Sequence, residues 1–272
     1  MSGAAGRPPT VVVHPDAAAL AQAVAARLLI RLLDVQSVRR PAHLGVTGGT
    51  IGTAILAAVA ASPLRGVVDW SGVHVWWGDE RFLPTGHAER NDTGARAALL
   101  DALGDALPAG NVHPVPGPGA AGIDSPEAAA ASYARELARF AVVREGADPT
   151  ASAPSVAVPA FDVLLLGMGP DGHIASLFPG HEALKVTETA VVGVHGAPKP
   201  PPERVSLTFE AIHAAREVWL VAAGTAKAAA AAAALGGGPL TEIPAVGAEG
   251  TTATLWLLDA EAATAPAAQL RP

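Results

Sequence analysis

The sequence contains no cysteine. Disulfide bonds, thiolate zinc ligands and a cysteine nucleophile are therefore excluded. No uninterrupted apolar run approaches the roughly 20 residues that span a membrane. The alanine-rich run at residues 228–235 is far too short, and the first nine residues lack the apolar core of a signal peptide. We therefore expect a cytoplasmic protein with no membrane partner.

Charged and aromatic residues are also scarce, at 16% and 4% of the 272 residues. Half of the residues are apolar, which is typical of a chain that folds around a core. The net charge of −7 is opposite in sign to that of most nucleic-acid binders, so we expect no nucleic-acid partner. No stretch divides the chain into halves with different patterns. We predict one α/β domain over residues 1–272, with a core at about residues 10–259 and frayed tails.

Short apolar runs alternate with segments of helical periodicity along the chain. Strands are predicted over residues 10–13, 42–46, 73–77, 161–167, 191–194, 205–209, 218–222 and 252–258. Helices are predicted over residues 16–33, 50–60, 93–103, 125–142 and 225–235, with Asp16 and Ser125 where N-terminal caps are expected. The Gly- and Pro-rich stretch 110–123 and the Ala-, Pro- and Ser-rich stretch 145–159 are predicted loops. The alternation predicts a layered α/β fold.

The apolar run Val-Leu-Leu-Leu at residues 163–166 is typical of a strand buried on both faces, as in a parallel sheet. It ends in Gly-Met-Gly-Pro-Asp-Gly-His, a glycine-rich loop that carries Asp171 and His173. If the loop bends, the Asp171 carboxylate can accept from the imidazole and leave the other ring nitrogen as a base. The alternative is a capping aspartate with a merely structural loop histidine. Ligands of open α/β sheets bind beyond the carboxyl ends of strands, and this favours the catalytic interpretation.

Two other turns that follow predicted strands have residues suited to an anion. Thr47, Gly48 and Gly49 lead into a helix whose first N–H groups are free to bind a phosphate. An ordinary tight turn would look the same. The triplet Asp-Glu-Arg ends in Arg81, whose planar fork fits oxyanions, although such triplets are more often surface ion pairs. Asn91 stands near a helix start, where it caps the helix or contacts a ligand.

Two cations further along the chain stand at the ends of predicted elements. Arg204 opens a strand after the proline run 198–202, and Lys227 begins a helix. Each alone is most often a solvated surface charge, but both could converge on an anion. No metal-ligand spacing such as His-Glu-x-x-His occurs among the histidines, and no Gly-x-Ser-x-Gly occurs. We expect neither a metal nor a serine-esterase mechanism.

The motifs, taken in order, resemble the 6-phosphogluconolactonase family. They are Thr-Gly-Gly-Thr at 47–50, Trp-Gly-Asp-Glu-Arg at 77–81, the segment 87–91, the fifteen-residue loop 167–181, Pro-Glu-Arg-Val-Ser-Leu-Thr at 202–208 and Gly-Thr-Ala-Lys at 224–227. The resemblance runs from about residue 10 to 259. The chain departs from it after the paired glycines, where Ser-Thr-Pro is common, and at Arg90, where serine is common.

The resemblance implies a Rossmann-like layered fold with a mostly parallel sheet covered by helices, similar to glucosamine-6-phosphate deaminase. It implies hydrolysis of 6-phospho-D-glucono-1,5-lactone to 6-phospho-D-gluconate, the second step of the oxidative pentose phosphate pathway, with no cofactor. His173 would deprotonate the attacking water, Asp171 would hold His173, and Arg81 would bind the substrate and stabilise the oxyanion. The remaining residues implied around the phosphate and the site are Thr47, Gly48, Gly49, Arg204, Lys227 and Asn91. We expect a monomer or a small homo-oligomer.

Two alternatives stay open. A sugar-phosphate deaminase or isomerase on the same fold typically has Asn-Glu after the Asp-Gly-His segment, whereas this chain continues to Ser-Leu-Phe-Pro-Gly at 176–180. A non-catalytic sugar-phosphate sensor usually carries a DNA-binding module ahead of the sensor domain, and only about ten residues precede the first predicted strand here.

Overall fold

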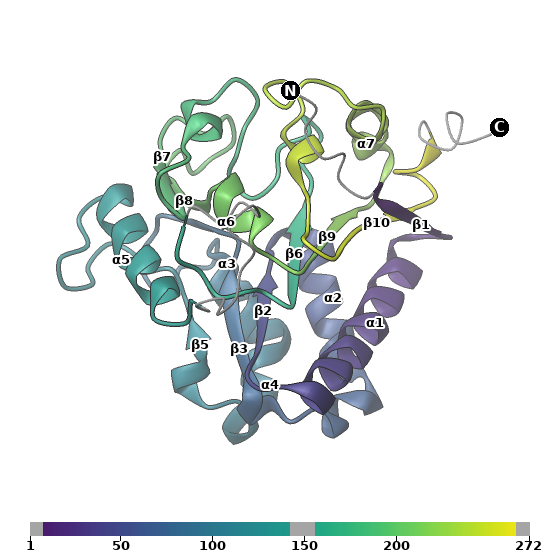
Figure 1. Cartoon of the computed structure of the whole chain (residues 1–272), viewed down its shortest axis with the longest axis vertical. Helices are drawn as coiled ribbons and strands as arrows, with labels where there is room; N and C mark the ends of the chain where they lie inside the picture. Colours follow the sequence, from purple (N-terminus) through teal and green to yellow (C-terminus); the bar gives the residue numbers. More distant parts are fainter. Residues whose placement is uncertain (1–7, 142–155, 265–272) are drawn as a thin grey trace, which may run out of the picture.

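The computed structural model describes residues 8–141 and 156–264 (Figure 1). Most of the predicted loop 145–159, and most of both predicted frayed tails, lie outside these residues. Within them, no helix is long and apolar enough to cross a membrane. The prediction of one domain over the whole chain stays a prediction.

The centre of the fold is a seven-stranded sheet in which every neighbouring pair is parallel, in the order β1-β10-β9-β6-β2-β3-β5. From β2 the chain adds β3 and β5 on one side, then returns to add β6, β9 and β10 on the other. The direction of winding therefore reverses between β2 and β6, and such switch points open a crevice at the carboxyl ends of the strands. The strands are β1 Thr10–His14, β2 Ala42–Val46, β3 Val73–Trp77, β5 Val112–His113, β6 Val163–Gly167, β9 Glu217–Ala222 and β10 Ala253–Asp259.

A second, antiparallel sheet stands apart from the first in the order β4-β8-β7. Its strands are β4 Asp79–Arg81, β8 Arg204–Leu207 and β7 Val191–Val194. The sequence predicted β7 and β8 as strands but did not separate them from the parallel sheet. It missed β4 because three charged residues carry no apolar alternation, and it missed β5 inside a stretch predicted as a loop. The mostly parallel sheet is confirmed for the larger layer only.

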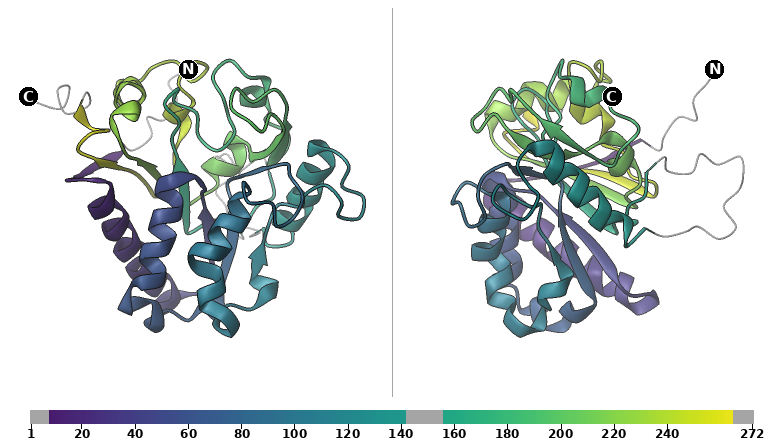
Figure 2. Two further views of the ribbon diagram at one scale, coloured as in Figure 1. Left: turned by 180° about the vertical axis from the view of Figure 1, so that it is seen from behind. Right: turned by 90° about the vertical axis from the view of Figure 1, so that its left-hand side faces the viewer.

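Helices α1, α2 and the helical run from α3 to α4 lie side by side on one face of the parallel sheet (Figure 2). The caps predicted for two helices are confirmed: Asp16 accepts from the backbone N–H of Ala19 at 2.8 Å, and Ser125 from that of Ala128 at 3.2 Å. The helix predicted over 93–103 is instead interrupted by a wider π-helical turn at Arg96–Leu100. The α-helices are α1 Ala17–Val38, α2 Gly49–Ala61, α3 Asn91–Ala95, α4 Asp101–Leu103, α5 Pro126–Ala138, α6 Phe209–His213 and α7 Ala228–Leu235.

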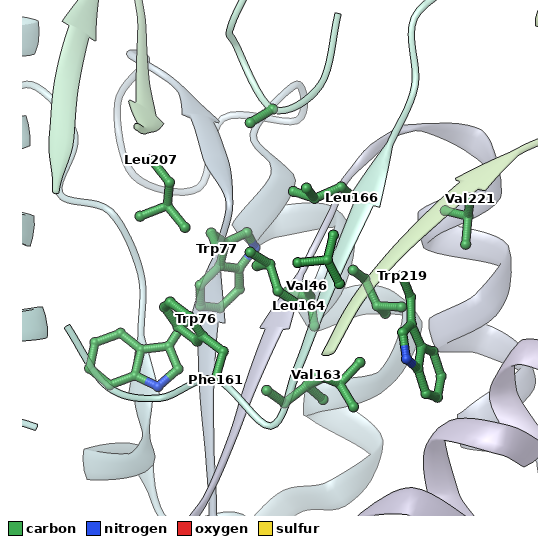
Figure 3. Close-up of a cluster of buried hydrophobic side chains, with 14 of the residues drawn as sticks. Val46, Trp76, Trp77, Phe161, Val163, Leu164, Leu166, Leu207, Trp219 and Val221 are labelled. Atoms are coloured by element: carbon green, nitrogen blue, oxygen red, sulfur yellow. The ribbon is translucent and has the colours of Figure 1, made fainter. Parts of the chain in front are cut away.

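Large side chains fill the core around the central strands (Figure 3). Val163 and Leu164 on β6 point to opposite faces of the sheet and are both 0% exposed, which confirms the predicted two-sided burial of this strand. Trp76 and Trp77 on β3 are also buried. The hydroxyl of Tyr133 on α5 accepts from the Trp77 N–H at 2.9 Å and donates to its carbonyl at 3.1 Å. This contact joins α5 to the end of β3, next to the second sheet.

Three histidines pack together on β2, β3 and β5. The His74 ring bonds His113 at 2.8 Å, and His113 bonds Glu136 at 3.0 Å and stacks on Trp76 with ring centres 3.8 Å apart. Burial, with the neighbouring histidines, lowers the pKa of His43 to about 3 and that of His113 to about 4. Both rings are therefore neutral in the folded protein under conditions that protonate them in the unfolded chain.

This cluster predicts a loss of stability on acidification. The ordinary pKa of histidine is about 6.5. Between that pH and about pH 4, His43 and His113 bind protons in the unfolded chain but stay neutral in the folded protein, so the free energy of unfolding falls as pH falls. The loss is at most about 1.4 kcal/mol per pH unit for each of the two rings. Urea unfolding at pH 7, 6 and 5 measures the slope, and His43→Gln is expected to reduce that slope relative to the wild-type chain. Equal slopes in the two proteins would contradict the assignment.

Candidate active site

A cavity of about 870 Å³ opens at the carboxyl ends of β2 and β6, at the reversal point of the sheet. The Thr47 hydroxyl, just after β2, accepts from the N–H of Gly167 at the end of β6 at 3.2 Å and so joins the two strand ends. The structure brings the site residues predicted from the sequence together here. Those lining the cavity are Thr47, Gly48, Gly49, Arg81, Asn91, His173, Arg204 and Lys227.

Asp171 is the one predicted site residue outside the lining, because it lies behind His173. Its Oδ1 is 2.5 Å from His173 Nδ1. Burial alone would raise the pKa of Asp171, but the hydrogen bond and charge of His173 outweigh it and lower that pKa to about 2. An ionised carboxylate only accepts, so Nδ1 carries a proton, and in the neutral form of the ring the lone pair is on Nε2. The His173 side chain, 16% exposed, can act as a base toward the cavity.

Glycine is required at two positions that shape this site. A Cβ on Gly169 would overlap the side chains of both His173 and Asp171. A Cβ on Gly48 would overlap the amide of Asn91, whose Nδ2 donates to the Asp79 carbonyl at 2.9 Å. The two glycines are therefore needed for different reasons: Gly169 leaves room for the His173–Asp171 pair, and Gly48 lets Asn91 approach the start of α2.

The loop that follows His173 is fixed by hydrogen bonds to the second sheet. The Ser176 hydroxyl donates to Asp79 Oδ2 at 2.7 Å, and the Ser206 hydroxyl accepts from the Ser176 N–H at 3.1 Å. Ala175, next to it, has a left-handed φ of 49°, a conformation that costs roughly 1 kcal/mol or more in a non-glycine residue. The sequence assigned no role to Asp79 or Ser176, because 97 residues separate the two partners.

Basic side chains converge on the cavity from separate elements. Arg81 on β4 stands directly opposite Arg204 on β8, and Lys199 and Lys227 line the same space. Arg81 Nη1 donates to the carbonyl of Glu89, while its buried Nε has no hydrogen-bond partner among the described residues. Like charges on opposite strands destabilise a sheet. This clustering is typical of a site whose ligand is an anion.

Burial lowers the pKa of Arg204, and both burial and the charge of Lys199 lower that of Lys227. An anion between these groups would relieve both effects, since it favours their charged forms. Lys199 was missed from the sequence. Its signal is a single cation inside the proline run 198–202, and such a cation has no special spacing.

Asp79 and Glu80, the acidic residues of the Asp-Glu-Arg triplet, are buried and do not form a surface ion-pair cluster. Asp79 and Glu80 are 7% and 1% exposed. Glu80 accepts from the backbone N–H groups of Asn91 at 2.7 Å and Asp92 at 2.9 Å, and thereby caps the start of α3. Burial raises the pKa of Glu80, although Arg90 opposes this. Glu80 thus has a structural role beside the site.

Within residues 8–141 and 156–264, no group of three or more histidine, aspartate or glutamate side chains is placed to hold a metal ion. The site has a histidine–carboxylate pair beside a cavity lined by cations, where the winding of the sheet reverses between β2 and β6. This arrangement defines a class: Rossmann-like α/β proteins that act on small anions.

The family follows from comparison with known proteins. Residues 15–256 match the family model described as glucosamine-6-phosphate isomerases/6-phosphogluconolactonase, and the chain belongs to this family. It is 52% identical over 263 residues to a 6-phosphogluconolactonase of Streptomyces coelicolor, covering 94% of each chain. It is 46% identical to one of Mycobacterium leprae, covering 93% of this chain and 97% of the relative.

Solved structures agree on the fold. A 6-phosphogluconolactonase from Trypanosoma brucei superposes with a TM-score of 0.78 at 28% identity, covering 94% of this chain and 98% of that one. A monomeric glucosamine-6-phosphate deaminase superposes with a TM-score of 0.74 at 17% identity, covering 94% and 99%, and this likeness concerns the fold alone. The predicted Rossmann-like fold and its similarity to the deaminase are confirmed.

Proposed function

We propose that this protein hydrolyses 6-phospho-D-glucono-1,5-lactone to 6-phospho-D-gluconate. The observation that carries the proposal is the His173–Asp171 pair, whose unprotonated ring nitrogen is available to a cavity lined by cations. A base near neutral pH is what a lactone needs for attack by water, and the cations suit a phosphorylated substrate. The related lactonases named above support the same substrate.

In the proposed reaction, His173 Nε2 takes a proton from a water molecule as the water oxygen attacks C1 of the lactone. The C1 carbonyl becomes a tetrahedral oxyanion, and its collapse breaks the bond from C1 to the ring oxygen. The imidazolium then returns its proton to the departing ring oxygen, and the carboxylic acid product ionises. Asp171 holds the ring and stabilises its charged form in both transition states.

The substrate's two ends need different partners. Arg81, whose buried Nε has no acceptor in the part of the chain that the structure describes, is suited to the oxyanion. Thr47, Gly48 and Gly49 at the start of α2, together with Arg204 and Lys227, surround the phosphate in this proposal. Asn91, held against Gly48, also lines the cavity.

The same fold also carries deamination, and the surroundings of His173 favour hydrolysis. The His173 ring packs on Phe178, with ring centres 4.5 Å apart, and the segment after His173 lacks the Asn-Glu that is typical of a deaminase. In the described part of the chain, Asp171 is the acidic group bonded to this histidine. Proton transfer between sugar carbons needs a further acid or base, whereas hydrolysis needs one base.

The two reactions are separated by giving the wild-type chain freshly made lactone and, in a parallel assay, glucosamine 6-phosphate. Acceleration of lactone loss over the spontaneous rate, without ammonia release from the amino sugar, is expected. Ammonia release with no effect on the lactone would replace the proposal by the deaminase function.

Asp171→Asn is expected to lower kcat about 10- to 100-fold, the effect of losing one hydrogen bond to a charged group. The amide cannot stabilise the imidazolium that forms in the transition state, whereas it leaves the phosphate contacts in place, so KM should change little. Steady-state kinetics measures both constants. Asp124→Asn, on an exposed loop, is the control. A kcat within twofold of the wild-type value would show that Asp171 is not needed to orient the base.

The proposed setting is the cytoplasm, with a small-molecule substrate, no cofactor, and no membrane or nucleic-acid partner. We propose a monomer or a small homo-oligomer.

A further inference from the structure

Lys199 lies in the proline run between β7 and β8 and lines the cavity. It is exposed, whereas the cavity's other basic residues, Arg81, Arg204 and Lys227, are buried or half-buried. An exposed lysine can bind a ligand at a defined place only if its backbone is fixed.

Arg204 fixes the backbone of this turn from the inside. Its Nη2 donates to the carbonyls of Lys199 at 3.0 Å and Pro200 at 3.3 Å, and its Nε donates to that of Pro201 at 3.2 Å. Arg204 is 6% exposed, and its guanidinium lies 5.7 Å from the centre of the Phe178 ring. Proline residues also restrict the backbone themselves. Lys199 is thus presented to the cavity on a rigid support.

The charge of Lys199 reaches two groups of the site. It contributes, after burial, to the lowered pKa of Lys227, and it contributes to the low pKa of Asp171. Lys199 therefore lies close enough to interact with both Lys227, in the anion site, and Asp171, beside His173. Two ammonium groups that repel each other across a cavity are stabilised when a doubly charged anion binds between them.

We propose that Lys199 is a substrate-binding residue that, with Lys227, contacts the phosphate dianion, and that Arg204 acts on the phosphate partly by presenting Lys199. Two of the three nitrogens of Arg204 are occupied by backbone carbonyls, which leaves Nη1 for the ligand. Lys199 closes the mouth of the site over the phosphate, and Lys227 holds it from below. This inference rests on the proposed lactonase function for the identity of the substrate.

The test compares Lys199→Met with the wild-type chain. Loss of one charge-assisted contact to phosphate is expected to raise two constants, each by about 10- to 100-fold. These are the Kd for 6-phosphogluconate, measured by calorimetry, and the KM for the lactone. The kcat should stay within about twofold, because the contact lies away from the reacting carbonyl. Lys185→Met is the matched control, since Lys185 is an exposed lysine paired with Glu182. Binding of unphosphorylated gluconate should be equally weak in all three proteins.

The outcomes separate the two proposals. A Kd for 6-phosphogluconate in Lys199→Met within twofold of the wild-type value overturns the inference. A fall in kcat at unchanged affinity also overturns it, because that result would place Lys199 at the reacting end of the substrate. A wild-type protein that binds 6-phosphogluconate no more tightly than gluconate overturns it as well. The lactonase proposal fails independently, when the wild-type chain binds 6-phosphogluconate but does not accelerate lactone loss.

Discussion

Replacing His173 with alanine is expected to lower kcat for lactone hydrolysis by ~10²–10⁴-fold, the usual contribution of a positioned general base. The variant keeps Arg204, Lys227 and the start of α2, so its affinity for 6-phosphogluconate should remain within a few-fold of wild type. The reason is geometric: His173 Nε2 is the ring nitrogen left free by Asp171, and the side chain lines the cavity without bonding the anion-site residues. Steady-state kinetics and calorimetry give the two quantities.

His195→Ala provides the comparison for this substitution. The His195 side chain is 56% exposed, contacts Glu127 and Glu203, and does not line the cavity. Its removal should leave kcat within twofold. If His173→Ala kept near-wild-type turnover, another group would have to be the base. If it instead lost affinity for the product at unchanged kcat, His173 would be a binding residue.

Replacing Arg90 with methionine is expected to lower the free energy of unfolding by about 3–5 kcal/mol, the cost of leaving a buried charge without its partner. Arg90 is 2% exposed and stands 3.5 Å from Glu80. It also donates to the carbonyls of Leu83 at 2.9 Å and Val115 at 2.6 Å. Methionine fills a similar length but leaves the charge of Glu80 without its cationic partner and these two carbonyls without the Arg90 donor. Urea unfolding at pH 7 measures the loss.

The control for Arg90 is Arg96→Met. Arg96 pairs with Asp92 on the same helix, but its side chain is 44% exposed, so its pair is expected to contribute about 0.5 kcal/mol. Equal, small losses from both substitutions would show that Arg90 does not stabilise the buried cluster. Because the Arg90→Met chain can protonate Glu80, its deficit relative to wild type should shrink as the pH is lowered from 7 to 5.

The central strands and the pairing of Asp171 with His173 could be predicted from the sequence because their determinants are local. The apolar run of β6 is continuous, the loop after it holds Asp171 two residues before His173, and the rule for open sheets places that loop at a ligand site. The caps at Asp16 and Ser125 are local in the same sense. Each feature depends on residues within a few positions of one another.

The second sheet and the support of the site could not be predicted, because they depend on pairings distant in sequence. Strand β4 is three charged residues, and it is a strand only because β8, more than one hundred residues later, bonds to it. The bond from Ser176 to Asp79 has the same character. Lys199 reaches the cavity because Arg204 holds its backbone, and no spacing rule expresses that contact. The role of Arg90, which departs from the common serine, became clear only from its buried partners.

The most direct measurement is proton release from freshly prepared 6-phosphogluconolactone, recorded in one assay for wild-type protein, His173→Ala and a protein-free blank. We predict that the wild-type protein accelerates proton release well above the spontaneous rate, and that the variant at the same concentration stays near the blank. A wild-type trace that coincides with the blank, or a variant as fast as the wild type, would contradict the assignment of a lactone hydrolase that works through His173.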